Sequence, residues 1–180
     1  PVLCYNFMPQ SGWYRTSFAK KGRGGALVTA FDSKLMQAAP QLTEAGTLTD
    51  IQIWDNYKYF MDKVLPVAEA CKVKLALHPD DPPIPSLQGV SRIFRNVENF
   101  DKALGLYPSD YNGITFCQGS FAAMNEDIPS LIRHFGRKIF FVHFRDIRGN
   151  ADAFEETFHD EGQTDMKACM RAYKEIGFDG

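Results

Sequence analysis

The chain has 180 residues, of which 44% are hydrophobic and 23% are charged, and its formal net charge is −2. This composition is typical of a globular protein, and we expect a single domain over residues 1–180. The charge gives no electrostatic footprint for nucleic acid, and no apolar run approaches the roughly 20 residues of a membrane-spanning helix. We therefore expect no nucleic-acid partner and no membrane partner.

The chain begins at Pro1 without a methionine, from which we expect a piece of a longer protein. Its four cysteines, Cys4, Cys71, Cys117 and Cys169, are too widely spaced to indicate a disulfide framework. We expect reduced thiols in a cytoplasmic protein. Cys71 and Cys169 fall on the apolar faces of predicted helices, so both are expected to be small buried core residues, and Cys4 is interpreted in the same way.

The first predicted element is a buried strand over residues 2–8 that ends at Pro9. It places Asn6 near its carboxyl end as a candidate site residue. Residues 10–21 mix aromatic and basic side chains, Arg15 among them, without a clean period, which predicts a long loop that covers a site.

Residues 20–25, with the sequence Lys-Lys-Gly-Arg-Gly-Gly, superficially resemble a phosphate-binding loop. Such a loop needs a following helix whose amino end holds the anion. Residues 26–31 instead predict a strand, so the phosphate interpretation is disfavoured.

From Asp50, apolar residues recur at steps of three and four, which predicts an amphipathic helix up to Cys71 with Thr49 as its N-cap. Pro66 is expected to kink or interrupt this helix. The expected buried positions are Ile51, Trp54, Tyr57, Met61, Val64, Ala68 and Cys71.

Three further helices are predicted, each with a capping residue: Asn96 for the first, Asn125 for the second and Thr164 for the third. Gly136 and Gly177 are expected to end the second and third. Strands lie between the helices, and this alternation predicts a parallel α/β fold. Because a full (β/α)₈ barrel needs about 250 residues, we expect a partial TIM barrel that lacks its first strands and its last strand.

Three of the predicted strands end at a potential metal ligand. Residues 74–77 lead into His78, residues 113–116 into Cys117 and residues 139–142 into His143. In a parallel sheet the carboxyl ends of the strands lie at one edge, so these side chains can converge. Imidazole and thiolate ligands together indicate a divalent transition metal.

Polar residues follow these ligands. Asp80 and Asp81 are expected to orient the His78 imidazole or to cap a turn. Arg145 shares a strand face with His143, so it either binds a substrate carboxylate or forms a salt bridge with Asp146 or Asp81. His159 lies in a polar loop that follows, and it is a candidate to reach the same site.

Several blocks of sequence together resemble the D-mannonate dehydratase family over nearly the whole chain. They are Cys4-Tyr5-Asn6-Phe7-Met8-Pro9 with Trp13 and Arg15, Arg23-Gly24-Gly25-Ala26-Leu27-Val28-Thr29, His78-Pro79-Asp80-Asp81-Pro82-Pro83, Cys117-Gln118-Gly119-Ser120 and His143-Phe144-Arg145.

The resemblance implies a xylose-isomerase-like TIM barrel and a lyase that converts D-mannonate into 2-dehydro-3-deoxy-D-gluconate in hexuronate catabolism, with Mn²⁺ or Fe²⁺. It also implies that His78, Cys117 and His143 are metal ligands. The family's remaining ligand, an aspartate in an Arg-Pro-Asp-His block, is expected beyond Gly180. We therefore expect residues 1–180 alone to be inactive and the full-length protein to be a homo-oligomer.

On this interpretation a metal stabilises the charge that develops when a proton beside the substrate carboxylate is removed. Asn6, Arg15 and Arg145 are expected to bind the substrate, and His159, with Arg145, to take part in catalysis unless the base lies beyond Gly180. One alternative is a metal-dependent sugar isomerase or epimerase of the same barrel type, against which Cys117 counts. Another is a non-catalytic module that binds metal or sugar.

Overall fold

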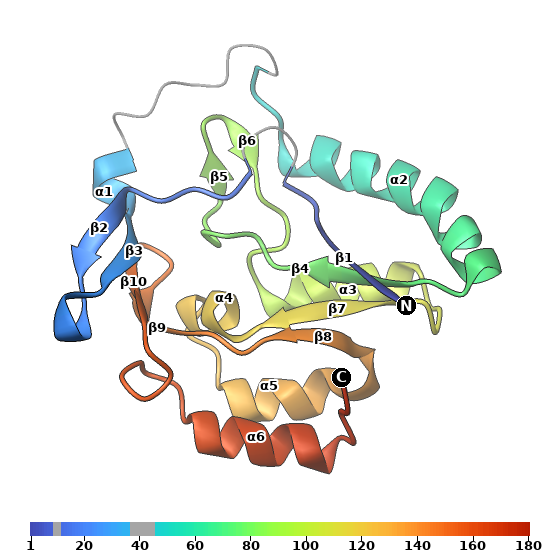
Figure 1. Cartoon of the computed structure of the whole chain (residues 1–180). Helices are drawn as coiled ribbons and strands as arrows, with labels where there is room; N and C mark the ends of the chain where they lie inside the picture. Colours follow the sequence, from blue (N-terminus) through green and yellow to red (C-terminus); the bar gives the residue numbers. More distant parts are fainter. Residues whose placement is uncertain (9–11, 37–45) are drawn as a thin grey trace.

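The computed structural model describes residues 1–8, 12–36 and 46–180. At its centre lies a four-stranded sheet in the order β1-β4-β7-β8, in which every neighbouring pair is parallel (Figure 1). The strands are β1 (Val2–Asn6), β4 (Lys74–His78), β7 (Asn112–Cys117) and β8 (Ile139–His143). In the register, Asn6 is opposite His78 and Cys117 is opposite His143. The prediction that these strands are parallel is confirmed, whereas Pro9 lies outside the described residues.

Helices lie between these strands in the chain: α2 (Asp50–Cys71) precedes β4, α3 (Val97–Leu106) precedes β7, and α4 (Gln118–Ala123) and α5 (Ile128–Phe135) separate β7 from β8. The last helix, α6 (Met166–Glu175), lies beside α5 (Figure 1). None of the helices in the described part of the chain is long and apolar enough to cross a membrane.

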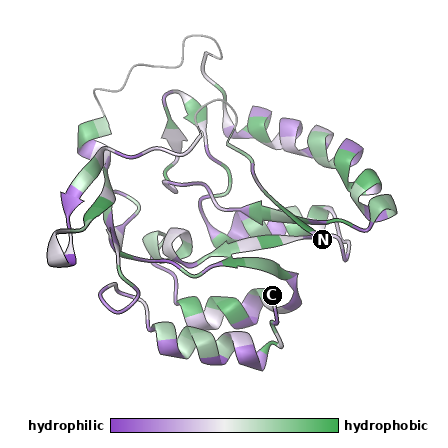
Figure 2. Cartoon of the chain, viewed as in Figure 1, coloured by the Kyte–Doolittle hydropathy of each residue, from purple (hydrophilic) through white to green (hydrophobic). Residues whose placement is uncertain are grey.

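The longest helix, α2, begins at a capping box in which the Thr49 side chain accepts from the Gln52 N–H and the Gln52 side chain accepts from the Thr49 N–H. It then runs unbroken through Pro66, so the predicted interruption there is wrong. Its buried face consists of Ile53, Trp54, Tyr57, Met61, Leu65 and Ala68. Figure 2 shows hydrophobic and hydrophilic residues alternating along the ribbon of α2.

The core is rich in aromatic rings that connect the helices to the sheet. Tyr57 of α2 contacts Phe94 with 5.0 Å between ring centroids, and Phe116 of β7 stacks on Phe121 of α4 at 4.8 Å. Phe100 of α3 contacts Phe121 at 5.2 Å. Burying a side chain of this size stabilises the fold by roughly 2 to 3 kcal/mol, and the contact of Phe116 packs α4 against β7 directly before Cys117.

A second sheet is antiparallel, with the order β2-β3-β10-β9. It consists of β2 (Ser17–Lys21), β3 (Leu27–Asp32), β10 (Ala153–Thr157) and β9 (Asp146–Asn150), with η1 (Arg23–Gly25) between β2 and β3. The smaller elements are α1 (Ser33–Met36), β5 (Ser86–Leu87), β6 (Val90–Ser91) and η2 (Gly136–Lys138). Because β9 begins three residues after β8 ends, this sheet stands at the carboxyl ends of the parallel strands.

The antiparallel sheet corrects two expectations. Residues 17–21 form a strand rather than part of a loop, and strands and helices do not alternate throughout. The strand predicted over residues 26–31 is confirmed as β3, in agreement with the rejection of a phosphate-binding loop.

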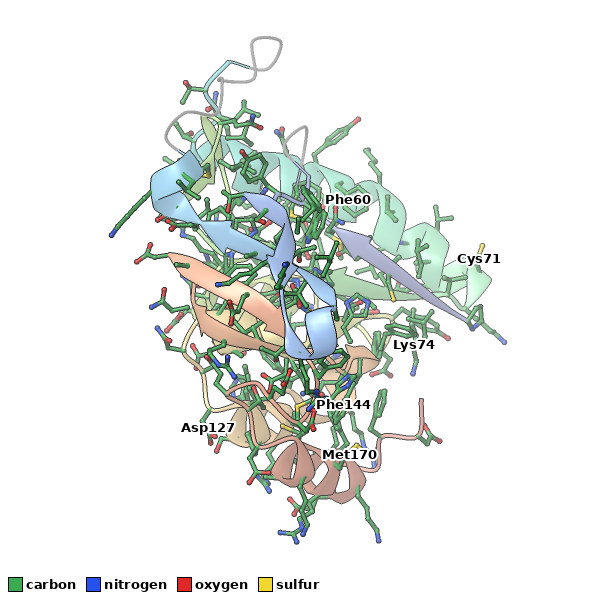
Figure 3. All side chains as sticks on the ribbon, turned by 60° about the vertical axis from the view of Figure 1, so that its left-hand side comes forward. Phe60, Cys71, Lys74, Asp127, Phe144 and Met170 are labelled. Atoms are coloured by element: carbon green, nitrogen blue, oxygen red, sulfur yellow. The ribbon has the colours of Figure 1, made fainter. Side chains whose placement is uncertain are left out.

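Burial differs from the prediction at two cysteines. Cys169 is buried as expected, but Cys4 and Cys71 are exposed. Cys4 lies on β1, which is the outer strand of the described sheet, so the expectation of a buried strand is wrong there. Cys71 is the last residue of α2 and lies at the far end of that helix (Figure 3).

Two of the predicted helix caps are also displaced. Helix α5 has Asp127 as its N-cap, and Asn125 instead adopts a left-handed conformation with φ 63°. Helix α6 is capped by Asp165, whose side chain accepts from the Ala168 N–H, and not by Thr164. Asn96 is confirmed as the N-cap of α3, where it accepts from the Asn99 N–H.

Candidate metal centre

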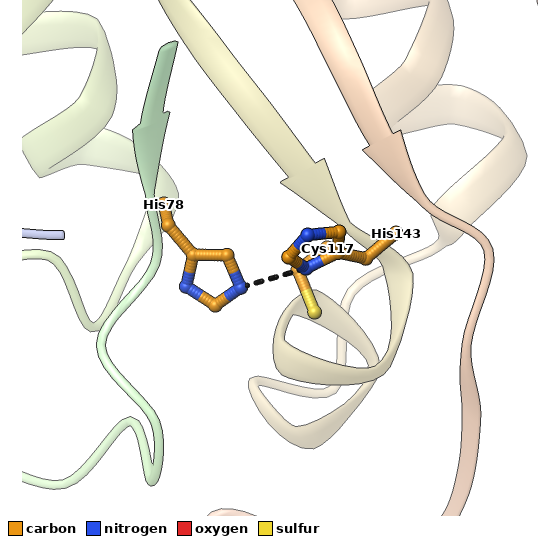
Figure 4. A group of neighbouring side chains, drawn as sticks. All are labelled: His78, Cys117 and His143. Atoms are coloured by element: carbon orange, nitrogen blue, oxygen red, sulfur yellow. Dashed lines mark hydrogen bonds between the residues drawn. The ribbon is translucent and has the colours of Figure 1, made fainter. Parts of the chain in front are cut away.

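The three predicted ligands converge. His78, Cys117 and His143 lie at the carboxyl ends of β4, β7 and β8, and one potential ligand atom of each lies within 4.8 Å of the others (Figure 4). The closest ring atoms, His78 Nε2 and His143 Nδ1, are 3.1 Å apart. The parallel register produces this arrangement, because it brings the last residue of each strand to one edge of the sheet.

The spacing of these atoms fits a bound metal ion. With metal–ligand distances of about 2.0 to 2.3 Å, two ligand atoms of a tetrahedral site lie roughly 3.3 to 3.8 Å apart. The two histidine nitrogens are 3.1 Å apart and all three ligand atoms lie within 4.8 Å of one another, close to this range. Two imidazoles and one thiol are also the donor types that suit a borderline transition metal.

Hydrogen bonding fixes the tautomer of His78. Its Nδ1 lies 2.6 Å from the carbonyl oxygen of Pro79, which can only accept, so Nδ1 carries the proton. Nε2 is then the atom with a free lone pair, and it is the atom that points into the cluster (Figure 4). A backbone carbonyl that orients an imidazole in this way is typical of metal-binding histidines.

The charge state of Cys117 also fits metal binding. Burial raises the pKa of this thiol, but the Arg145 charge and the neighbouring side chains of His143 and His78 outweigh it and hold the pKa well below its ordinary value. Conversely, burial lowers the pKa of His78, yet the neighbouring Cys117 raises it overall. The thiolate is the form of cysteine that binds metals.

Beside the cluster lies a network of four charged residues, in which Arg15 and Asp81 are buried and Arg145 and Glu156 are partly buried. Arg15 donates to both carboxylate oxygens of Asp81, at 2.6 and 2.9 Å, and to Glu156 at 3.0 Å. Arg145 donates to Asp81 at 3.1 Å and to Glu156 at 2.8 Å. Each carboxylate therefore joins the two guanidinium groups, which suits the planar fork of arginine.

Of the two alternatives for Arg145, its salt bridge with Asp81 is present in the structure. Asp146 does not take part in it: its carboxylate accepts from the backbone N–H groups of Ile147 and Thr164. Arg145 Nη1 also lies 3.2 Å from Cys117 Sγ. Its Nη2 is buried, and within the described residues it has no hydrogen-bond partner.

The other predicted site residues differ in how exposed they are to solvent. Asn6 is exposed at the end of β1, opposite His78. Arg15 is only 5% exposed, and its donors are directed at protein acceptors. Asp80 is fully buried and accepts from the Phe94 N–H at 2.7 Å, which anchors the loop after β4.

His159 is exposed and is not part of the three-residue cluster. Its Nε2 donates to the carbonyl oxygen of Phe144 at 2.6 Å, and its ring stacks on that of Phe144 with 5.6 Å between centroids. Since Phe144 directly follows His143, His159 lies near the same end of the sheet. Donation from Nε2 leaves Nδ1 with the free lone pair.

Three residues of the site were not predicted to act in it: Gly119 and Ser120, which occur in the Cys117-Gln118-Gly119-Ser120 block, and Glu156. Ser120 Oγ donates to Cys117 Sγ at 3.3 Å. Glu156 is two residues from the buried Phe154, and this spacing of two could have placed both on the inner face of β10.

Comparisons with known proteins point to one family. The family model of D-mannonate dehydratase (UxuA) matches residues 1–49 and 41–180. The mannonate dehydratase of Thermotoga petrophila is 36% identical over 215 residues, covering 99% of this chain and 59% of that protein. Mannonate dehydratase 1 of Halalkalibacterium halodurans is 36% identical over 213 residues, covering 99% and 58%. The chain thus spans less than two thirds of the length of these relatives.

Two solved structures are similar. The mannonate dehydratase of Streptococcus suis serotype 2 aligns with a TM-score of 0.89 and 32% identity, covering 100% of this chain and 55% of that one. The IOLI protein, solved with a bound zinc atom, aligns with a TM-score of 0.56 and 23% identity, covering 76% of this chain and 48% of that one. The second similarity concerns the fold alone.

Proposed function

The chain belongs to the D-mannonate dehydratase family, and from that premise we propose that the protein is a hydro-lyase that converts D-mannonate into 2-dehydro-3-deoxy-D-gluconate in hexuronate catabolism. The observation that carries the proposal is the convergence of His78, Cys117 and His143 within 4.8 Å. A cytoplasmic location and a homo-oligomeric full-length protein stay predictions from the sequence.

The fold we propose is part of a (β/α)₈ barrel. Four parallel strands in sequential order, with helices in the connections between them, support it, as does the similarity to the fold of the IOLI protein. The candidate site lies at the carboxyl ends of the strands, which is where barrel enzymes have their active sites.

The metal we propose is Mn²⁺ or Fe²⁺, held by His78 Nε2, Cys117 Sγ and a ring nitrogen of His143. The mixed nitrogen and sulfur donors favour a transition metal over Mg²⁺, and the zinc atom of the IOLI protein is consistent with a divalent cation. When bound, such a cation supplies a Lewis acid that stabilises negative charge beside the substrate carboxylate.

The protein side chains then bind the substrate and move its proton. Arg145 Nη2 is the free donor of its guanidinium, so we assign it one hydrogen bond to a substrate oxygen. Asn6 is exposed at the same edge and is proposed to bind a hydroxyl group. Arg15 was predicted to contact the substrate, but its N–H groups already donate to protein acceptors. We therefore assign Arg15 the role of holding Asp81 in place.

The proton-transfer group we propose within this chain is His159. Its Nε2–H is engaged by the Phe144 carbonyl, which leaves Nδ1 able to accept a proton. The ring is exposed and is held on Phe144, next to His143, so we assign Nδ1 the proton of a substrate bound there.

The alternatives predict different products. A sugar isomerase or epimerase would convert an aldose and leave mannonate unchanged, and a non-catalytic module would bind metal without turnover. The test is an assay of keto-acid formation from D-mannonate by the full-length protein with Mn²⁺ or Fe²⁺, in parallel with an aldose. We expect keto acid to form from mannonate and the aldose to stay unconverted. Conversion of the aldose without conversion of mannonate would contradict the proposal.

Cys117→Ser tests the ligand assignment in the same assay. We expect a loss of metal affinity of at least about tenfold, because the thiolate ligand is removed, and a corresponding loss of activity. Cys169→Ser is the matched control, since Cys169 is also a buried thiol but belongs to α6. Wild-type metal content in Cys117→Ser would show that Cys117 is not a ligand.

A further inference from the structure

We propose that Arg145 is a positioning residue of the metal centre, whose guanidinium fixes the sulfur of Cys117 in place. This inference rests on the proposed metal centre and adds a residue that contacts one of its ligands. It assigns to Arg145 a role that is exercised before any substrate arrives.

The contacts at the sulfur carry the inference. Arg145 Nη1 lies 3.2 Å from Cys117 Sγ, and Ser120 Oγ donates to the same atom at 3.3 Å. Cys117 is 1% exposed, so the protein rather than water surrounds its sulfur. A hydrogen bond from a cation to a thiolate is charge-assisted, and it both orients the sulfur and reduces its electron donation to a metal.

The guanidinium itself is held on two further sides. Nε donates to Glu156 at 2.8 Å and Nη1 donates to Asp81 at 3.1 Å. Arg15 holds both of these carboxylates in turn. Arg145 therefore cannot rotate away from Cys117 without breaking this partly buried network, which makes it a fixed part of the site.

Gly119 provides the space for this arrangement. A Cβ atom at position 119 would lie 2.8 Å from Arg145 Nε and 2.9 Å from its Cγ, closer than Cβ atoms approach other atoms in proteins. The first turn of α4 lies against the stem of Arg145, so any side chain at position 119 would displace the guanidinium. Glycine is needed here for close approach and not for an unusual backbone conformation.

The test measures Co²⁺ binding by the metal-free protein without substrate, using affinity and the sulfur-to-cobalt charge-transfer absorption as readouts. Arg145→Lys keeps the charge but cannot bridge Glu156, Asp81 and Cys117 with one planar group. We expect about 10- to 100-fold weaker Co²⁺ binding and a shifted charge-transfer band.

A double-mutant cycle shows whether the effect acts through the sulfur. In a Cys117→Ser background, Arg145→Lys is expected to change Co²⁺ affinity by no more than about twofold, because the interaction that it breaks is already gone. The matched control is Arg148→Lys on β9, an exposed arginine paired with Glu155, for which no more than about a twofold change is expected.

Gly119→Ala is the second variant, since it retains every polar group and only pushes Arg145 aside. Weaker Co²⁺ binding and a band shift in the same direction as in Arg145→Lys are expected. The inference about Arg145 would be overturned if Arg145→Lys lowered Co²⁺ affinity equally in the wild-type and Cys117→Ser backgrounds. It would also be overturned if the charge-transfer band were unchanged in both Arg145→Lys and Gly119→Ala. Neither result would contradict the metal centre itself. Failure of the unsubstituted protein to bind Co²⁺ would overturn the metal centre and this inference with it.

Discussion

Asp80 and Asp81 are neighbours in the chain, but their surroundings shift the pKa values of their carboxyl groups in opposite directions. Burial raises the pKa of Asp81, but the charge of Arg145 and the hydrogen bonds of Arg15 bring it below its usual value. Burial raises the pKa of Asp80 to about 6, because Arg92 and the Phe94 N–H offset it only in part. Asp80 Oδ1 is buried without a partner among the described residues.

This difference predicts a pH dependence of stability that Asp80→Asn should remove. The folded-state pKa of Asp80, about 6, exceeds the ordinary value of 3.8. Between these values the unfolded chain releases a proton that the folded protein keeps, so the free energy of unfolding falls as pH rises. The full loss of about 3 kcal/mol is reached above pH 6.

Urea unfolding at pH 4 and pH 7, with a chelator present, measures this effect. The wild type should lose about 2 to 3 kcal/mol more than Asp80→Asn between the two pH values. The Asn variant is a suitable comparison because its amide oxygen can still accept from the Phe94 N–H. The same pH dependence in both proteins would contradict the assignment.

At the scale of elements, α2 contains a proline in its interior. Pro66 is exposed and lacks the N–H that would bond within the helix, yet the helix continues through it. Interior proline is the least favourable residue in a helix, by roughly 3 kcal/mol relative to alanine. Packing of the face that includes Tyr57 and Met61 outweighs this cost.

Pro66→Ala should therefore raise the free energy of unfolding by about 1 to 3 kcal/mol, since it restores a helix hydrogen bond without removing buried surface. Thermal or urea unfolding measures the change. Val67→Ala, at an exposed neighbouring position, is the control and should stay within about 0.5 kcal/mol of wild type. Pro66→Ala that is neutral or destabilising would contradict this account of α2.

The elements that could be predicted from the sequence are those with a local pattern of apolar and polar residues. The strands ending at His78, Cys117 and His143 are short apolar runs followed by polar residues, and α2 carries a helical apolar period. The antiparallel sheet was missed because β2 exposes Phe18 and two lysines, so it shows no alternation of apolar and polar residues. Its pairing joins β3 to β10 across more than a hundred residues, and sequence periodicity does not report such pairing.

At the scale of the whole molecule, the two sheets meet at the charged network beside the metal ligands. Arg15 precedes β2, Asp81 follows β4, Arg145 follows β8 and Glu156 lies on β10. The hydrogen bond between Arg15 and Glu156 joins residues 141 positions apart. The three ligands could be predicted because each ends a strand, whereas this network depends on tertiary contacts that no local pattern specifies.

The central claim is that His78, Cys117 and His143 form a divalent metal centre. X-ray absorption at the metal edge of the Mn²⁺- or Fe²⁺-loaded protein tests it most directly. We expect one sulfur neighbour at about 2.3 Å and imidazole scattering at about 2.1 Å, with the sulfur lost in Cys117→Ser and retained in Cys169→Ser. A spectrum with nitrogen and oxygen neighbours only, unchanged by Cys117→Ser, would contradict the account.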